Sequence, residues 1–193
     1  MTTVSAAPVP SDAAPSALSG TYAINPTHTR IGFVARHAMV TKVRGSFNEF
    51  EGTATLDFED VSRSSASVTI TAASIDTRQA QRDAHLRSND FLAMDEFPTI
   101  TFVSTAARRT GEAEFELDGE LTVRGVAQPV TIPFTFEGTA LDPFGNTRVG
   151  FEGSVVINRK DFGVSYNAAL ETGGVLISDK VTLEFEVSAV KTA

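Results

Sequence analysis

Apolar and polar side chains alternate strictly along two segments of the chain, residues 130–137 and 181–189. Their apolar members are Val130, Ile132, Phe134 and Phe136 in the first, and Val181, Leu183, Phe185, Val187 and Ala189 in the second. Successive side chains of a β-strand point to opposite faces, so each segment has one apolar and one polar face. The pattern is typical of an antiparallel sheet that is solvated on one side only.

Shorter segments of β character follow one another from Tyr22 onward. They cover residues 22–24, 31–36, 47–58, 68–72, 100–102, 115–123, 151–157 and 175–177. Residues 142–146, Asp-Pro-Phe-Gly-Asn, predict a turn. Asp118-Gly119 is compatible with a hairpin or with a bulged continuous strand. Together the segments make about eight to ten strands without a βαβ rhythm, which predicts an all-β sandwich or barrel.

One polar segment interrupts the β pattern. Residues 77–87 are rich in helix formers and lack Gly and Pro. Asp76 is a plausible N-cap, and Gln79 three residues later mimics a capping box. We therefore expect a helix at 77–87, and we consider a shorter helix at residues 36–41.

Length and composition favour one domain with an apolar interior. The chain has 193 residues, no Cys, no Trp, 2 Tyr and 14 Phe, and Phe supplies apolar area without a polar group. Residues 1–19 are rich in Ala, Pro, Ser and Thr and lack a signal-peptide pattern. We expect them to form a disordered tail, residues 20–193 to form the domain, and the protein to be cytoplasmic rather than periplasmic or secreted.

Charge and hydropathy argue against two classes of partner. The formal net charge of −8 repels phosphate backbones, so we expect no nucleic-acid binding. No segment approaches the roughly 18 apolar residues of a membrane-spanning helix, so we expect no stable membrane insertion. A homodimer is compatible with the sequence, but no sequence feature locates an interface.

The sequence contains no catalytic motif such as Gly-x-Ser-x-Gly or a phosphate-binding glycine loop. The three histidines, His28, His37 and His85, are far apart in sequence, and we predict no metal site from them. They leave open an alternative in which an internal pocket serves an enzyme with His acid–base or metal chemistry.

Two polar clusters have two interpretations each. Arg82 and His85 lie on the predicted helix, where they either tie the helix to the rim of the sheet or contact the polar head group of a ligand. Arg159 and Asp161, near the end of the 151–157 strand, allow the same two interpretations. The alternating carboxylates of residues 112–120 are best explained as a solvated strand face.

An ordered set of residues resembles a known family over about residues 20–190. The set includes Tyr22-Ala-Ile-Asn-Pro-Thr-His28, Gly45-Ser-Phe47, Arg82-Asp-Ala-His-Leu86, Phe97-Pro98, Leu121-Thr-Val-Arg-Gly-Val126, Arg159-Lys-Asp-Phe-Gly163 and Ile177-Ser-Asp-Lys-Val181. It resembles the YceI-like family of lipocalin-like, polyisoprenoid-binding proteins. The resemblance implies an all-β fold: an extended eight-stranded antiparallel barrel with a short helix near one end.

The resemblance also implies a function without catalysis. The protein would bind a long apolar lipid, a polyisoprenoid, an isoprenoid quinone or a fatty-acid derivative, in an internal tunnel as carrier or store, with no cofactor required. A filled β-sandwich used for protein interaction is a further alternative. The residues expected to bind the ligand are Phe33, Phe102, Leu121, Val123, Phe134, Phe136, Phe151, Ile157 and Phe185 in the tunnel wall, with Arg82 and His85 at the mouth.

Overall fold

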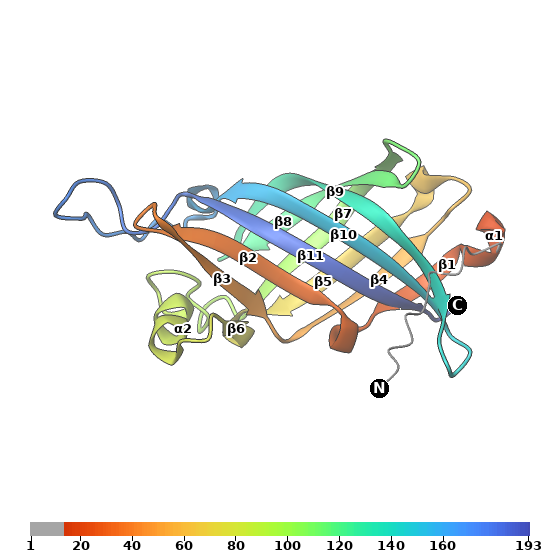
Figure 1. Ribbon diagram of the computed structural model, residues 1–193, viewed down its shortest axis with the longest axis horizontal. Helices are drawn as coiled ribbons and strands as arrows, with labels where there is room; N and C mark the ends of the chain where they lie inside the picture. Colours follow the sequence, from red (N-terminus) through yellow and green to blue (C-terminus); the bar gives the residue numbers. More distant parts are fainter. Residues whose placement is uncertain (1–13) are drawn as a thin grey trace, which may run out of the picture.

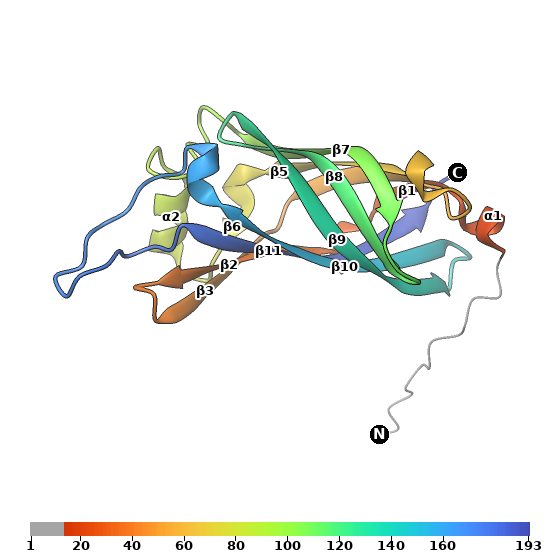
Figure 2. The same ribbon diagram turned by 90° about the horizontal axis from the view of Figure 1, so that it is seen from above.

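The computed structural model describes residues 14–193 and consists mainly of one elongated antiparallel barrel (Figures 1 and 2). Its strands are β1 (Gly20–Ile24), β2 (Arg30–His37), β3 (Thr41–Phe47), β4 (Phe50–Leu56), β5 (Ser65–Thr71), β6 (Ile75–Asp76), β7 (Thr99–Arg109), β8 (Glu114–Val123), β9 (Val126–Leu141), β10 (Thr147–Asn158) and β11 (Lys180–Lys191). The helices are α1 (Pro15–Leu18) and α2 (Ala80–Arg87), with short 3₁₀ turns η1 (Pro26–His28), η2 (Val61–Arg63), η3 (Ala72–Ser74) and η4 (Arg159–Phe162).

Eleven strands make an eight-stranded ring because three of the ring's strands are each broken into two. Turn η1 separates β1 from β2, residues 48–49 separate β3 from β4, and η3 separates β5 from β6. The ring closes where β1 pairs with both β4 and β11. All its pairings are antiparallel. The eight-stranded antiparallel barrel expected from the sequence is confirmed, and the filled sandwich is wrong.

The two ends of the barrel are built differently. At one end β6 pairs with β3 and not with β7, which begins at Thr99 opposite Thr71 of β5; α2 lies at this end, on the left in Figures 1 and 2. We call it the open end. The other end, near β1 and the β9–β10 turn, is filled by a cluster of Tyr22, Leu56, Phe58, Phe136, Val149, Phe151 and Ala189. We call it the closed end.

Both helix predictions need correction. Helix α2 begins at Ala80, with Gln79 and not Asp76 as its N-cap. Asp76 still belongs to β6, where it pairs with Ser46. The Asp83 carboxylate accepts hydrogen bonds from the amide (2.9 Å) and hydroxyl (2.5 Å) of Thr77, which holds that residue outside the helix. Residues 36–41 form no helix, because they comprise the end of β2, the turn of residues 38–40 and the first residue of β3.

The remaining local predictions have mixed outcomes. Asp118-Gly119 lies inside a continuous strand, and the irregularity falls on the partner strand between Ser104 and Ala106. Residues 142–146 form the predicted turn, with the Gly145 amide donating to the Asp142 carbonyl at 3.0 Å. The expected tail of residues 1–19 lies largely outside the described residues, and its last part includes α1.

Among residues 14–193, none of the helices combines the length and the apolarity needed to cross a membrane.

Candidate functional site: an apolar cavity inside the barrel

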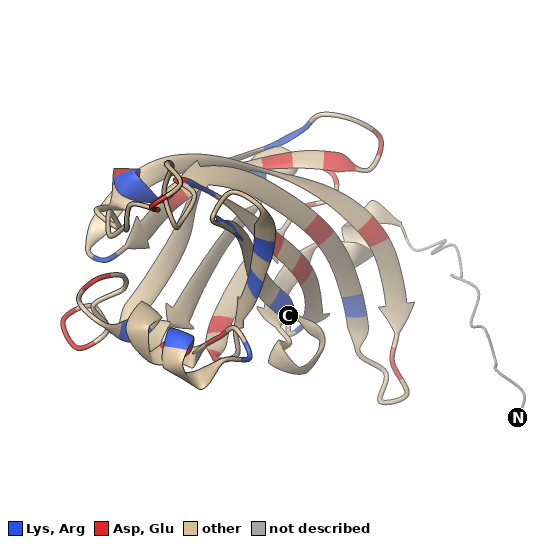
Figure 3. Ribbon diagram, turned by 60° about the vertical axis from the view of Figure 1, so that its left-hand side comes forward, with Lys and Arg blue, Asp and Glu red and all other residues tan. Residues whose placement is uncertain are grey.

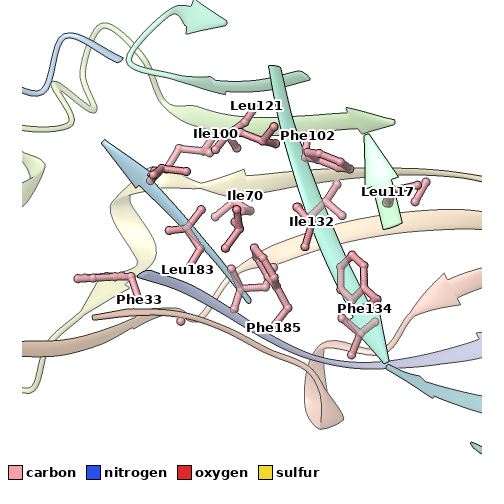
Figure 4. A pocket seen from close by; sticks show the side chains of 18 of the residues that line it. Phe33, Ile70, Ile100, Phe102, Leu117, Leu121, Ile132, Phe134, Leu183 and Phe185 are labelled. Carbon is pink, nitrogen blue, oxygen red and sulfur yellow. The ribbon is translucent and has the colours of Figure 1, made fainter. Parts of the chain in front are cut away.

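A cavity of about 350 Å³ lies inside the barrel, and all eleven strands contribute to its wall. Figure 4 shows side chains from opposite walls pointing toward one another, among them Ile70, Ile100, Ile132 and Leu183. At the open end, Leu86, Phe91 and Leu92 of α2 and the following loop complete the wall where β6 and β7 do not pair. The volume falls within the roughly 300–1,000 Å³ of small-molecule sites.

The interior of the barrel is only partly filled. Leu117, Phe134, Leu183 and Phe185 all point inward, yet each retains a measurable exposed area. In a close-packed core such side chains would be covered on all sides. The barrel therefore encloses apolar surface that has no partner within the described protein.

Two glycines help to keep the phenylalanine rings against the wall. Phe33 is paired with Gly45, and Phe134 with Gly153, on the neighbouring strand. A Cβ on Gly45 would lie 2.3 Å from the Phe33 ring, and one on Gly153 would lie 2.6 Å from the Phe134 ring. Each ring thus covers a glycine where any other residue would push it toward the lumen.

Most of the apolar residues that the sequence suggested are in this wall. Eight of the nine line the cavity: Phe33, Phe102, Leu121, Val123, Phe134, Phe151, Ile157 and Phe185. Phe136 does not line it. Its ring packs against Phe58 and Phe151, at centroid distances of 5.4 and 5.3 Å, in the closed-end cluster. Phe136 therefore forms part of the floor beneath the cavity.

The two polar residues suggested for the mouth lie near it without lining it. Arg82 donates to Thr77, from Nε to the hydroxyl (2.7 Å) and from Nη2 to the carbonyl (2.8 Å). His85 Nε2 lies 2.7 Å from the Asp90 carboxylate, and its ring meets Phe91 edge-on at 4.9 Å. Phe91 lines the cavity, so His85 lies one layer behind the wall.

Arg159 is the one Lys, Arg or His among the described residues that line the cavity. Its side chain is buried, and it donates to the carbonyls of Ser178 (2.9 Å), Val164 (2.7 Å) and Tyr166 (2.8 Å). Within the described part of the chain Nη2 has no hydrogen-bond partner, and it lies 3.9 Å from the Asp179 carboxylate. Burial lowers the pKa of Arg159, and Asp179 opposes that shift.

The sequence interpretation named Arg159 but did not rank it as a site residue. The signal that could have identified it is its place directly after an inward-facing apolar strand, because a cation there loses its solvation and needs polar partners. Its neighbour Asp161 is exposed, and its main-chain carbonyl accepts a hydrogen bond from the side-chain amide of Gln128 at 2.9 Å.

The histidines do not converge. None of His28, His37 and His85 lines the cavity. Within residues 14–193, no group of three or more His, Cys, Asp or Glu side chains is placed to hold a metal ion.

Comparisons with known proteins agree with the barrel geometry. The family model described as YceI-like domain matches residues 22–189. A UPF0312 protein of Staphylococcus aureus strain MSSA476 is 38% identical over 163 residues, covering 84% of this chain and 91% of that protein. Among solved structures, Burkholderia cenocepacia BcnA matches with a TM-score of 0.76 at 24% identity, covering 86% of this chain and 98% of its own.

A second solved structure is described as a polyisoprenoid-binding domain from Saccharophagus degradans. It matches with a TM-score of 0.68 at 12% identity and covers 89% of this chain and 98% of its own. At these identities the two structures show the shared fold alone. The family model and the staphylococcal relative go further, because they match most of the chain in sequence. The protein therefore belongs to the YceI-like domain family.

Proposed function

We propose that the protein binds one long apolar lipid inside the barrel and serves as its carrier or store. The observation that carries this proposal is the apolar surface of the inward side chains, which the protein itself leaves uncovered. Covering it with a ligand is favourable by about 0.8 kcal/mol for each buried methylene group.

The shape of the wall favours an extended chain. Its inward positions on β11 run from Val181 to Ala189, a span of about 26 Å at the usual rise per strand residue. The lining offers almost no polar side chain along this path. A hydrocarbon chain that is many methylene or isoprene units long and free of polar groups matches such a lining.

A polyisoprenoid is the ligand class that we place first, with an isoprenoid quinone or a fatty acyl chain as variants of the same chemistry. The Saccharophagus degradans neighbour, described as polyisoprenoid-binding, supports this choice by analogy of fold. We further propose that the polar end of the ligand lies at the open end, near Arg159, Arg82 and His85. These cationic or ionisable groups would lie next to an oxygen-bearing head group.

Adjacent residues of β10 provide a matched test. Val155 lines the cavity, whereas Val156 is 57% exposed. Val155→Trp should fill part of the lumen and weaken binding of the fluorescent fatty acid cis-parinaric acid, and of farnesol as its competitor, by at least about tenfold. Val156→Trp should leave both affinities unchanged. Equal affinities in the two variants, or no binding by the unmodified protein, would contradict an internal lipid site.

A further inference from the structure

The turn of the hairpin formed by β2 and β3 has backbone angles that its residues disfavour. We call residues 36–44 the open-end hairpin, because Figures 1 and 2 place it at the same end as α2. Ala38 and Met39 have φ values of 50° and 59°. Residues with a Cβ rarely adopt this left-handed region, which Gly and Asn tolerate far better. Local conformational preference therefore does not explain the choice of Ala and Met here.

The strands of the same hairpin carry a second violation. Arg36 and Lys42 are directly opposite each other, and like charges in this arrangement are destabilising. Arg44, two residues beyond Lys42, shares its face. Among the described residues, neither Arg36 nor Lys42 forms an ion pair. In a chain with net charge −8, residues 30–48 contain four Lys or Arg residues and no acidic one; two of the four, Arg30 and Arg44, lie 3.3 and 4.0 Å from the Glu184 carboxylate.

The tip of the hairpin is apolar and uncovered. Met39 is 56% exposed and Val40 is 76% exposed. Beside them lies the loop of residues 167–177, since the Ala38 amide donates to the Leu176 carbonyl at 2.7 Å and His37 forms an antiparallel bridge with Ile177. Both segments extend beyond the barrel at its open end in Figures 1 and 2.

Violations of local rules that bring no structural gain concentrate at functional sites. Here strained backbone, facing cations and an exposed apolar tip occur within nine residues. Apolar side chains surrounded by basic ones are the combination that binds an anionic membrane surface, through burial in the headgroup region and attraction to lipid phosphates. The unpaired charges of Arg36 and Lys42 beside an exposed apolar tip favour a lipid surface as the occupant.

We propose that the open-end hairpin docks the protein on an anionic lipid bilayer. Met39 and Val40 enter the headgroup region, while Arg36, Lys42 and Arg44 face the phosphates. Phe33 and Ala35 of the same strand line the cavity, so docking brings the open end of the cavity to the lipid surface. Figure 3 turns this end toward the viewer and shows both basic and acidic residues on the elements around it, so the proposed surface is limited to the open-end hairpin. The inference concerns this surface and does not depend on which lipid the cavity holds.

The test is co-sedimentation of the full chain with phosphatidylcholine vesicles, with and without one third phosphatidylglycerol, at low and high salt. We expect binding to the phosphatidylglycerol vesicles that salt weakens. Val40→Ser should lower this binding, and Lys42→Glu should lower it by about fivefold or more, since each basic residue near such a surface contributes about 1 kcal/mol. Lys42→Glu also converts a repulsive cross-strand pair into an attractive one, so the variant should keep or raise the Tm.

The opposite end of the barrel provides the control. Leu141 and Phe144 are 73% and 86% exposed in the β9–β10 turn, but the neighbouring Arg148 is paired with Asp142. Replacing Leu141 and Phe144 together with Ser should leave vesicle binding unchanged. An equal loss in this control, or no vesicle binding by the unmodified protein, would overturn the proposal.

A redesigned turn separates docking from folding. Ala38→Asn combined with Met39→Gly suits the left-handed backbone and should raise the Tm by a few degrees, while vesicle binding falls. Full vesicle binding by this variant would contradict the role of the tip. Hairpin variants that change self-association in gel filtration, but leave vesicle binding unchanged, would contradict it too. Binding of cis-parinaric acid should be unchanged in every hairpin variant, so failure of docking and failure of the internal lipid site are read separately.

Discussion

At the scale of single residues, the lumen depends on positions that lack a side chain. Gly45 and Gly153 leave room for the rings of Phe33 and Phe134 to cover the neighbouring strand. With larger residues at these positions the rings would move into the cavity. The apolar residues of the wall explain its chemistry, and the glycines help to explain why it is hollow.

Two glycines of β10 give the corresponding prediction. Gly153→Ala places a Cβ 2.6 Å from the Phe134 ring and 2.7 Å from the Pro133 carbonyl, whereas Gly150→Ala meets nothing closer than 3.7 Å. We expect Gly153→Ala to lower the free energy of unfolding by about 1–3 kcal/mol and to weaken cis-parinaric acid binding. Gly150→Ala should change both far less. Urea unfolding and fluorescence titration measure the two effects, and equal behaviour of the two variants would refute the account of the wall.

A second residue-scale prediction concerns pH and the closed end. Hydrogen bonds from the amides of Asn146 and Phe144 and from the side chains of Asn146 and Arg148 lower the pKa of Asp142 to about 2. Because this folded-state pKa lies below the unfolded value of about 3.9, the stabilisation is complete above pH 4 and disappears as the pH falls toward 2.

Amide exchange of Phe144 and Asn146 should therefore accelerate through this window in the native protein. In Asp142→Asn the exchange should be faster at neutral pH and should lose this pH dependence after correction for intrinsic exchange. An unchanged profile in the variant would show that the carboxylate does not hold the turn.

At the scale of elements, α2 closes the gap that strand pairing leaves between β6 and β7. Arg87 donates from Nε to the carbonyl of Ala73 (2.8 Å) and from Nη2 to that of Ile75 (3.2 Å), while Arg82 and Asp83 bond to Thr77. The helix is thus held by polar contacts with the segment before it, together with Leu86, which packs against the core. Such a contact set suits an element that opens while the barrel stays intact.

Arg87→Ala should therefore speed the release of a bound lipid. Loss of two hydrogen bonds from a charged group is worth at least about 1.4 kcal/mol, or tenfold in rate if opening limits release. Stopped-flow transfer of cis-parinaric acid to excess vesicles measures the rate. Arg109→Ala, which removes an arginine at the end of β7 that donates to the Gly111 carbonyl of the following turn, is the control, and the same acceleration there would contradict a gating role for α2.

The elements also show where sequence patterns were sufficient. Two-residue alternation located the long strands β9 and β11, because both have one face in the lumen and one in solvent. It failed at residues 36–41, since a strained turn of Ala and Met has no turn signature. The start of α2 was misplaced because Asp83 holds Thr77 extended, a contact formed within the folded segment. Phe136 has the same position in the alternating pattern as Phe134, so the sequence does not distinguish them. Only the closed barrel places Phe136 in the closed-end cluster and Phe134 in the cavity wall.

At the scale of the whole molecule, the two ends are built differently. The closed end is packed around Tyr22 and Val149, which are almost fully buried. The open end combines α2, the open-end hairpin and the loop of residues 167–177 around the gap between β6 and β7. On the proposed function, a ligand would enter and leave at the open end.

The central claim is that the lumen holds one lipid, and native mass spectrometry tests it most directly. The protein, incubated with a polyprenol and separated from excess, should carry one added mass equal to one ligand. Val156→Trp should keep this complex, and Val155→Trp should lose most of it. Absence of the complex from the unmodified protein, or its equal persistence in both tryptophan variants, would contradict a lipid site inside the barrel.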